Sequence, residues 1–286
     1  MSSILRRDTF EMRNRMQCGQ CGNEQFTKAG RDRQARQLYR CRACGRRLTA
    51  RSASAFRGYR FPDEIVALAV RWYLRFRLSY ADLVELLAER GVHVDPSTIF
   101  DWVQHFTPLY QDAARLQRRR VGQRWSIDET YIRIAGQWCY AFRAIDDEGQ
   151  VIDVYVSPTR DTAAATAFLT RAVESTEVTP AVATTDRAAI YPPALAAVLP
   201  EVEHLRGKMV QQRIERDHQH LKGRTRCMRG FQTLPRAQVV CQGHGFLRNL
   251  RNGCYDLRVP GSDPHLPQAP RLVRAWDELT LALAKA

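Results

Sequence analysis

Apolar and polar positions follow two different periods along this chain, and the change between them lies near Gly122. Residues 61–106 repeat apolar side chains at helical spacing, whereas residues 124–157 alternate as strands do. Further helix-like stretches and one more short apolar run follow this alternation. The pattern therefore predicts an α/β protein of several domains, in which a helical part precedes a mixed part of strands and helices.

Three consecutive helices are predicted within residues 61–106. Pro62 can open the first, Ser79 and Asp82 form a variant capping box at the second, and Asp95 caps the third with Pro96 in its first position. Two capped helices with a short connection fit a helix-turn-helix, whose second helix reads DNA. Many three-helix bundles share this pattern and bind nothing, so both interpretations stay open. The predicted base-reading candidates are Ser97, Thr98 and Gln104.

Three antiparallel strands joined by tight turns are predicted after Gly122, and a helix, a fourth strand and two further helices follow them. This βββαβα order is that of the ribonuclease-H-like fold. A helix, a Pro-rich linker and a last amphipathic helix end the sequence. The predicted elements are strands at 124–134, 138–145, 151–157 and 178–185, helices at 162–174, 190–199, 210–222, 234–251 and 271–284, and the linker at 260–270.

Three acidic residues occupy positions that suit a metal-dependent active site. Asp128 and Asp186 each close a short apolar, strand-like run, and Glu215 lies in a helix-like segment rich in cations. Carboxylates are the ligands that Mg²⁺ or Mn²⁺ prefers. Two such ions would neutralise a phosphodiester, activate a water or a DNA 3′-hydroxyl, and stabilise the leaving oxygen. These three residues are therefore the predicted metal ligands and catalytic residues.

Neighbouring acidic residues are assigned other roles. Glu129 follows Asp128 and, in a strand, is expected to face the opposite way, while Asp217 lies on a different side of the helix from Glu215. Asp146 belongs to a turn, where exposure to solvent is expected. Asp161 begins a helix, so that a capping role is the simplest account.

Two cysteine pairs near the amino terminus predict a structural zinc site. Cys18 with Cys21 and Cys41 with Cys44 form two CxxC turns, each followed by glycine, and 19 residues separate the pairs. Four thiolates can surround one tetrahedral Zn²⁺. A strand over 37–40 suits a zinc ribbon. A redox dithiol is the competing interpretation, and it is disfavoured because no thioredoxin-like pattern surrounds either pair.

The charge of the chain indicates a polyanionic partner. Its 286 residues carry a net charge of +14, with a pI near 9.8, and no apolar run is long enough to span a membrane. No signal peptide is recognised, and the cysteine usage favours a reducing cytoplasm. A solvated surface is the alternative for each single cation. The candidate DNA contacts among the charged residues are Arg119, Arg120, Arg213, Arg216, His218, Lys222 and Arg224.

Several short motifs follow one another along the chain. They are Asp128-Glu-Thr-Tyr131, Ser157-Pro-Thr-Arg-Asp161, Thr185-Asp186, Tyr191-Pro192, Arg213-Ile-Glu-Arg-Asp-His218 and Arg229-Gly-Phe231. In this order they resemble the DDE transposases of the IS6/IS26/IS240 group of bacterial insertion sequences. The resemblance runs from about residue 61 to about residue 253.

The resemblance implies metal-dependent nicking at transposon ends and strand transfer into target DNA, with Asp128, Asp186 and Glu215 at the positions of the family's catalytic triad. Because transposon ends come in pairs, a homodimer or larger assembly is expected. Only 28 residues separate Asp186 from Glu215, fewer than in well-known members. A DNA-binding regulator without catalysis and another ribonuclease-H-like nuclease or integrase are the alternatives.

The patterns together predict four parts of the chain. They are a zinc ribbon at 1–58, the helix-turn-helix with a linker helix that ends near Arg120 at 59–121, the catalytic domain at 122–255, and the linker with the last helix at 256–286.

Overall fold

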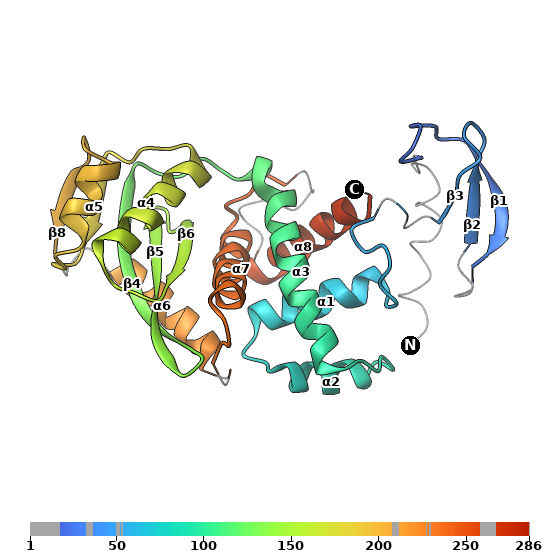
Figure 1. The fold of residues 1–286 in the computed structure, drawn as a ribbon, viewed down its shortest axis with the longest axis horizontal. Coiled ribbons are helices and arrows are strands. Elements are labelled where there is room, and N and C mark those ends of the chain that lie inside the picture. The colour runs from blue at the N-terminus through green and yellow to red at the C-terminus, as the bar shows by residue number, and fades with distance from the viewer. Residues whose placement is uncertain are drawn as a thin grey trace. The chain divides into compact units, whose positions relative to one another are not determined.

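The computed structural model describes residues 18–32, 37–49, 52, 54–207, 212–226, 228, 230–257 and 267–285, with the backbone alone at 212, 213, 216 and 217 (Figure 1). These residues form two compact units. One consists of the described parts of 1–64 and 279–286, and the other of the described parts of 65–278. Within the described residues, no helix combines the length and the apolar character that crossing a bilayer requires.

A small antiparallel sheet forms the amino-terminal unit. Its strands are β1 (Phe26–Arg31), β2 (Gln37–Cys41) and β3 (Arg47–Thr49), with β2 in the middle. The strand predicted at 37–40 is therefore confirmed. Its apolar core consists of Cys18, Cys41, Leu48 and the half-buried Phe26. So small a core stabilises a fold weakly, which is the usual situation of a domain that depends on a metal.

The second unit begins with the three predicted helices, α1 (Asp63–Arg75), α2 (Tyr80–Ala88) and α3 (Pro96–Ala114). The capping box at α2 is present, because the Ser79 hydroxyl accepts from the Asp82 N–H at 3.1 Å and the Asp82 carboxylate accepts from the Ser79 N–H at 2.7 Å. These two bonds satisfy N–H groups that no helical carbonyl can reach.

The linker helix was predicted to end near Arg120, and this end point is wrong. A short 3₁₀ turn, η2 (Arg115–Gln117), ends the helical run, and Arg118 instead forms a β-bridge with Tyr255. The Arg118 guanidinium donates to the carbonyls of Val151 and Ile152 at 2.8 and 2.9 Å. These long-range bonds, which local sequence does not reveal, hold the segment extended against the sheet.

A five-stranded mixed sheet follows, in the order β6-β5-β4-β7-β8. The first three strands are antiparallel hairpin neighbours, whereas β7 and β8 run parallel to β4. Strand β8 was not predicted, because its four residues, Glu-His-Leu-Arg, carry no alternating apolar signal. The strands are β4 (Arg124–Ile134), β5 (Gln137–Asp146), β6 (Val151–Ser157), β7 (Val182–Thr185) and β8 (Glu203–Arg206).

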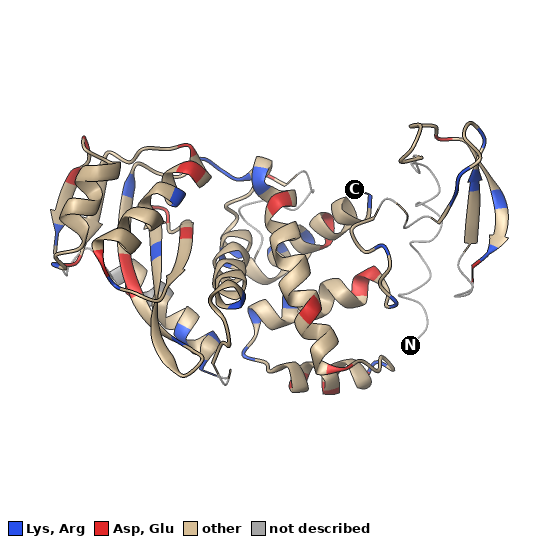
Figure 2. Ribbon diagram, viewed as in Figure 1, with Lys and Arg blue, Asp and Glu red and all other residues tan. Residues whose placement is uncertain are grey.

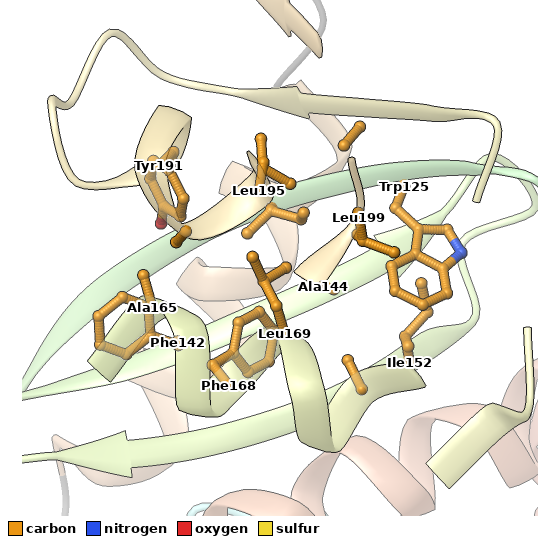
Figure 3. Close-up of a cluster of buried hydrophobic side chains, with 14 of the residues drawn as sticks. Trp125, Phe142, Ala144, Ile152, Ala165, Phe168, Leu169, Tyr191, Leu195 and Leu199 are labelled. Atoms are coloured by element: carbon orange, nitrogen blue, oxygen red, sulfur yellow. The ribbon is translucent and has the colours of Figure 1, made fainter. Parts of the chain in front are cut away.

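Two pairs of helices cover the two faces of this sheet. The helices α4 (Thr162–Thr176) and α5 (Tyr191–Val198) pack with the strands around a buried apolar cluster that includes Trp125, Phe142 and Phe168 (Figure 3). The other face carries α6 (Gln212–Thr225) and α7 (Leu234–Asn252) (Figure 1). Burial of large side chains is the main stabilising contribution, and truncating one such as Phe168 to alanine costs about 3–5 kcal/mol.

Helix α7 fits between the sheet and the helical part because two of its glycines allow close approach. A Cβ at Gly243 would lie 2.5 Å from the Thr107 side chain, and one at Gly245 would lie 3.0 Å from Val151. The last helix, α8 (Gln268–Lys285), joins the same helical part, where the Trp276 indole donates to the Ala67 carbonyl at 3.0 Å. Most of the predicted Pro-rich linker lies outside the described residues.

The turn between β5 and β6 corrects one expectation. Asp146 is buried, and its carboxylate accepts from the N–H groups of Gly122, Glu148 and Gln150 at 2.9, 3.1 and 2.7 Å. It therefore organises the turn from inside, because a buried carboxylate is stable when backbone donors surround it. Asp161 caps α4 as expected, accepting from the Ala164 N–H at 2.8 Å.

Candidate metal centres and active site

Four thiols from the two CxxC turns gather in the amino-terminal unit. The sulfurs of Cys18 and Cys44 are 3.5 Å apart, those of Cys21 and Cys41 are 3.6 Å apart, and all four lie within 4.8 Å of one another. Tetrahedral zinc with Zn–S bonds of about 2.3 Å requires sulfurs about 3.8 Å apart. The donor set and its spacing therefore fit a structural Zn²⁺.

The turns favour thiolate over thiol at Cys18 and Cys41, whereas burial and the hydrogen bonds with the other sulfurs raise the pKa of the Cys21 thiol to about 12. The backbone N–H of Cys44 contributes most to lowering the pKa of the Cys41 thiol to about 6, and the N–H of Gln20 lowers the pKa of Cys18. Zinc binds thiolates, so donors that stabilise the negative sulfur reduce the free energy needed to deprotonate the ligands.

Three carboxylates gather at the centre of the five-stranded sheet. The side chains of Asp128, Glu129 and Asp186 each offer an oxygen within 4.8 Å of the others. Asp128 lies on β4, and Asp186 follows the end of the parallel neighbour β7. The two strands pair through Ser126, after which the edge of β4 is left without β7 as a neighbour. The sheet therefore opens where the carboxylates meet, and hard oxygen donors suit a divalent cation.

Glu129 was expected to face away from Asp128 and was therefore left out of the predicted metal ligands, but its carboxylate lies in this cluster. Its strand face is indeed the opposite one, toward α5, where Tyr191 donates a short hydrogen bond to it. The carboxylate nevertheless reaches the open edge of β4. There it also accepts from Arg160, whose guanidinium is 3.3 Å from an Asp186 oxygen. Alternation decides which face a side chain leaves from, but not where a long side chain ends.

Charge repulsion and burial act strongly on Asp128. Burial, then the nearby charges of Glu129 and Asp186, raise the pKa of the Asp128 carboxyl to about 7. Arg160 supplies the opposing positive charge, lying between Glu129 and Asp186. A cationic side chain thus already occupies the midst of these acids, which supports the interpretation that the cluster binds cations.

Helix α6 brings His218 to this cluster and leaves Glu215 outside it. The His218 Nδ1 lies 3.5 Å from an Asp128 oxygen, and the His218 side chain is buried. Glu215 is exposed and does not belong to the group of acids within 4.8 Å. It precedes His218 by three residues, which places the two on the same side of the helix, about one turn apart.

The predicted DNA contacts are found in different environments. The predicted DNA contact at Arg224 is wrong, because this side chain is buried, donates to the Tyr73 carbonyl at 2.6 Å and lies over the Tyr73 ring. Such a side chain stabilises the fold and does not present its charge to a ligand. The remaining candidates are exposed at Ser97, Arg119, Arg120 and Lys222, half-buried at Thr98 and Gln104, and outside the described side chains at Arg213 and Arg216.

Arg160 and Tyr191 are site residues that had no predicted role. Both stood in motifs that carried the family resemblance, so the signal was present without a chemical assignment. Their contact with Glu129 depends on bringing the loop before α4 and the start of α5 to the same end of β4, and the local pattern says nothing about that arrangement.

Comparison with known proteins identifies relatives of this chain. Residues 122–254 match a family model described as a DDE domain, of the IS240 type. The transposase for insertion sequence-like element IS431mec of Staphylococcus aureus strain Mu50 is 37% identical over 174 residues, which cover 59% of this chain and 77% of that protein. The transposase of IS257 in transposon Tn4003, also from S. aureus, has the same identity and coverage.

The matched domain defines a class of DNA-rearranging enzyme, the DDE transposases. The chain belongs to the IS6/IS240 group of these transposases, which confirms the family predicted from the sequence motifs. It is an insertion-sequence transposase, a polynucleotidyl transferase. Among solved structures, the catalytic core domain of BIV integrase is 16% identical, with a TM-score of 0.35, over 46% of this chain and 84% of that one.

Proposed function

We propose that Asp128, Asp186 and Glu215 form the catalytic triad of this transposase and hold Mg²⁺ or Mn²⁺. When bound, the metal would activate the attacking oxygen and stabilise the leaving oxygen of a phosphodiester. The observation that carries the proposal is the meeting of Asp128 and Asp186 at the open edge of β4, with α6 packed beside them through His218.

Glu215 is proposed as the third ligand in preference to Glu129. The Glu129 carboxylate has both oxygens engaged, one by Arg160 and the other by the Tyr191 hydroxyl, and its side chain is 5% exposed. Glu215 is exposed on the side of α6 that carries His218. Movement of the helix, or of the side chain, toward the carboxylates would let the metal bind it.

The neighbouring residues hold this arrangement without taking part in bond breaking. The Ala188 N–H donates to Asp186 at 2.8 Å, which fixes the direction of that carboxylate. His218 sits against Asp128 from α6, and Tyr191 anchors Glu129 from the apolar core. Positioning of this kind matters because phosphoryl transfer depends on accurate placement and charge stabilisation more than on any protein nucleophile.

The other parts of the chain are proposed to bind DNA. We interpret the catalytic domain, over 122–255, as ribonuclease-H-like, which its strand order β6-β5-β4-β7-β8 supports. The parts over 1–58 and 59–121 act as a zinc ribbon and a helix-turn-helix at the transposon ends, and 256–286 helps in assembly of a homodimer or larger oligomer. Arginine and lysine side chains on several elements supply positive charge toward phosphates (Figure 2).

The triad is tested by strand cleavage and transfer on a duplex that carries the inverted repeat flanking the gene. We expect Asp128→Asn, Asp186→Asn and Glu215→Gln each to reduce Mg²⁺-dependent cleavage by about a hundredfold or more. Glu129→Gln is the matched control, since it removes one charge from the adjacent position, and we expect it to keep most of the activity. If Glu129→Gln loses cleavage and Glu215→Gln keeps it, Glu129 and not Glu215 is the third metal ligand.

The DNA-binding role of the amino-terminal parts is tested separately from catalysis. Removal of zinc, with Mg²⁺ restored, should weaken binding to the end-containing duplex, and affinity should fall steeply as salt rises because counterions are released. The same duplex with a scrambled repeat is the control. An affinity for the end-containing duplex that does not change when zinc is removed would show that the ribbon does not contact the ends.

A further inference from the structure

An exposed group of aromatic residues lies on the β4–β5 hairpin, beyond the part of the sheet that α4 and α5 cover. Trp138 is 62% exposed and Tyr131 is 54% exposed, although both are large and mostly apolar. Tyr140 pairs with Tyr131 across the two strands, and Arg133 pairs with Trp138. We name these four residues the aromatic platform. Side chains of this kind are commonly buried or used in binding.

The rings of the platform contact one another, and those of Trp138 and Tyr131 stay more than half exposed. The Tyr131 ring centroid is 5.1 Å from that of Tyr140 and 6.3 Å from that of Trp138. The Arg133 guanidinium lies 5.6 Å from the Trp138 ring centroid. The Tyr131 and Trp138 rings are nearly perpendicular, with an interplanar angle of 84°, and Arg133 lies over one face of Trp138. Each of the two rings therefore offers its own exposed area to a ligand on this face of the hairpin.

The backbone beneath the platform is held firmly. Ala135 and Gly136 both have positive φ, at 48° and 79°, as a two-residue type I′ hairpin turn requires. The Ala135 N–H donates to the Phe231 carbonyl at 2.7 Å, and the Phe231 N–H donates to the Arg133 carbonyl at 3.0 Å. The hairpin is thus tied to the segment that follows α6, and a preorganised surface loses little entropy on binding.

The platform is continuous with the carboxylate cluster. Tyr131 follows Glu129 by two residues on β4, so their side chains leave the same face of the strand. Arg160 bonds Glu129 and Asp186, so a cation lies among the acids next to Tyr131 along the strand. A ligand lying on the platform would therefore reach the acids through a path edged by two arginines, Arg133 and Arg160.

We propose that the aromatic platform binds unpaired nucleotides of the DNA strand whose phosphodiester enters the carboxylate cluster, with bases stacked on Trp138 and Tyr131. This rests on the proposed function of the cluster. A stacked ring needs a free base face, which an intact duplex does not offer, so the occupant is a single strand. Arg133 and Arg160 match its phosphates in charge. Stacking tolerates any base, because every base has a π face.

The proposal is tested first by binding, with Mg²⁺ absent so that chemistry plays no part. A fluorescent single-stranded oligonucleotide and a blunt duplex are compared by anisotropy with the full chain. Trp138→Ala and Tyr131→Ala should each weaken single-strand binding about 5- to 150-fold, because each stacked base contributes about 1–3 kcal/mol, and should leave duplex binding nearly unchanged. Trp138→Phe and Tyr131→Phe should restore most of the loss.

Phe76→Ala is the matched control, because Phe76 is also an exposed ring, 47% accessible, with Arg75 lying 5.3 Å from its centroid. It should leave single-strand affinity unchanged. Equal losses in Phe76→Ala and Trp138→Ala, or an equal loss for duplex and single strand, would overturn the proposal. So would unchanged affinity with a lower oligomeric mass in Trp138→Ala, which would make the platform a contact between copies of the chain.

A second measurement separates this proposal from the function of the cluster. In Glu215→Gln, with Mg²⁺ absent, single-strand binding and its sensitivity to Trp138→Ala should persist. If this binding persists but the triad proves dispensable for cleavage, the proposal for the platform is supported and the catalytic assignment is wrong. Loss of binding in Glu215→Gln would contradict a platform that acts independently of the metal ligands.

Discussion

The four thiols and the three carboxylates are both clusters of candidate metal ligands, yet the chain builds them differently. The thiols come from two tight turns, and Cys18 and Cys44 are 26 positions apart. Asp128 and Asp186 come from neighbouring parallel strands that two other strands and a helix separate along the chain. The thiols lie at nearly the spacing that zinc requires, whereas the carboxylates are held together partly by the guanidinium of Arg160.

The difference shows how each cluster depends on its surroundings. Soft thiolates on turns suit a metal that would replace an apolar core, so a metal bound there would be part of the fold. The carboxylates sit on a sheet whose stability comes from a separate buried cluster, including Trp125 and Phe168 (Figure 3). They can therefore tolerate repulsion among themselves, which a functional site often requires.

The largest expected effect is the loss of zinc from the ribbon. Cys41→Ser should abolish zinc binding and unfold the amino-terminal unit, because a structural zinc contributes about 10–16 kcal/mol at neutral pH. Zinc content by mass spectrometry and amide exchange over 18–49 measure this. Cys254→Ser is the control, and it should keep one zinc per chain. If the amides of the ribbon stay protected from exchange without zinc, its apolar residues and not the metal stabilise it.

Substitution of a carboxylate, unlike substitution of a zinc-site thiol, is expected to stabilise the metal-free protein. The folded-state pKa of Asp128, about 7, lies above the ordinary value of 3.8, so the protonated form is favoured in the fold. Stability from this group is present at low pH and lost as pH rises from about 4 to 7. Asp128→Asn should therefore stabilise the metal-free protein at pH 8 by ~1–4 kcal/mol, since a tenfold change in an acid dissociation constant corresponds to about 1.4 kcal/mol.

Urea unfolding at pH 5 and pH 8 measures this effect, with Asp101→Asn, an exposed residue of α3, as the control. The gain should shrink toward pH 5 in Asp128→Asn and be absent in the control. Equal stability of the wild type and Asp128→Asn at pH 8 would mean that the like charges cost nothing.

A smaller effect is expected where only tertiary packing is altered. Gly243→Ala adds a methyl group 2.5 Å from the Thr107 side chain, so α7 must shift against α3, and overpacking of this kind costs about 1–3 kcal/mol. Thermal unfolding measures it. Gly207→Ala is the control, because a Cβ there meets nothing within 4 Å. A neutral Gly243→Ala would mean that this helix pair repacks freely.

The smallest expected effect is on a feature that is entirely local. Ser79→Ala removes the side-chain acceptor of the α2 capping box and should cost about 1 kcal/mol. Ser79→Asn, which can replace the hydroxyl as a cap, should retain most of the stability. Chemical denaturation of the second unit compares the two, and equal losses would assign the effect to the serine's position and not to its hydrogen bond.

Features encoded within a few residues were predictable. The ends of β4 and β6 agree with the predicted strands, and the capping box of α2 is present as expected. The short strand β8 was missed, and Arg118 proved to be extended, because a polar edge strand and a long-range bridge leave no periodic signal. Asp146 and Arg224 were taken for exposed side chains, since nothing near them in sequence shows what covers them.

The sequence by itself determined the four candidate thiol ligands, the order of the elements except β8, and the family, because each depends on residue types at short spacing. The tertiary structure decided which groups meet. It brings Glu129 and Arg160 into the acidic cluster, holds His218 against Asp128 and leaves Glu215 outside. Those contacts depend on where the pairing of β4 with β7 stops and how α6 crosses the sheet, and such distances arise only when distant segments pack.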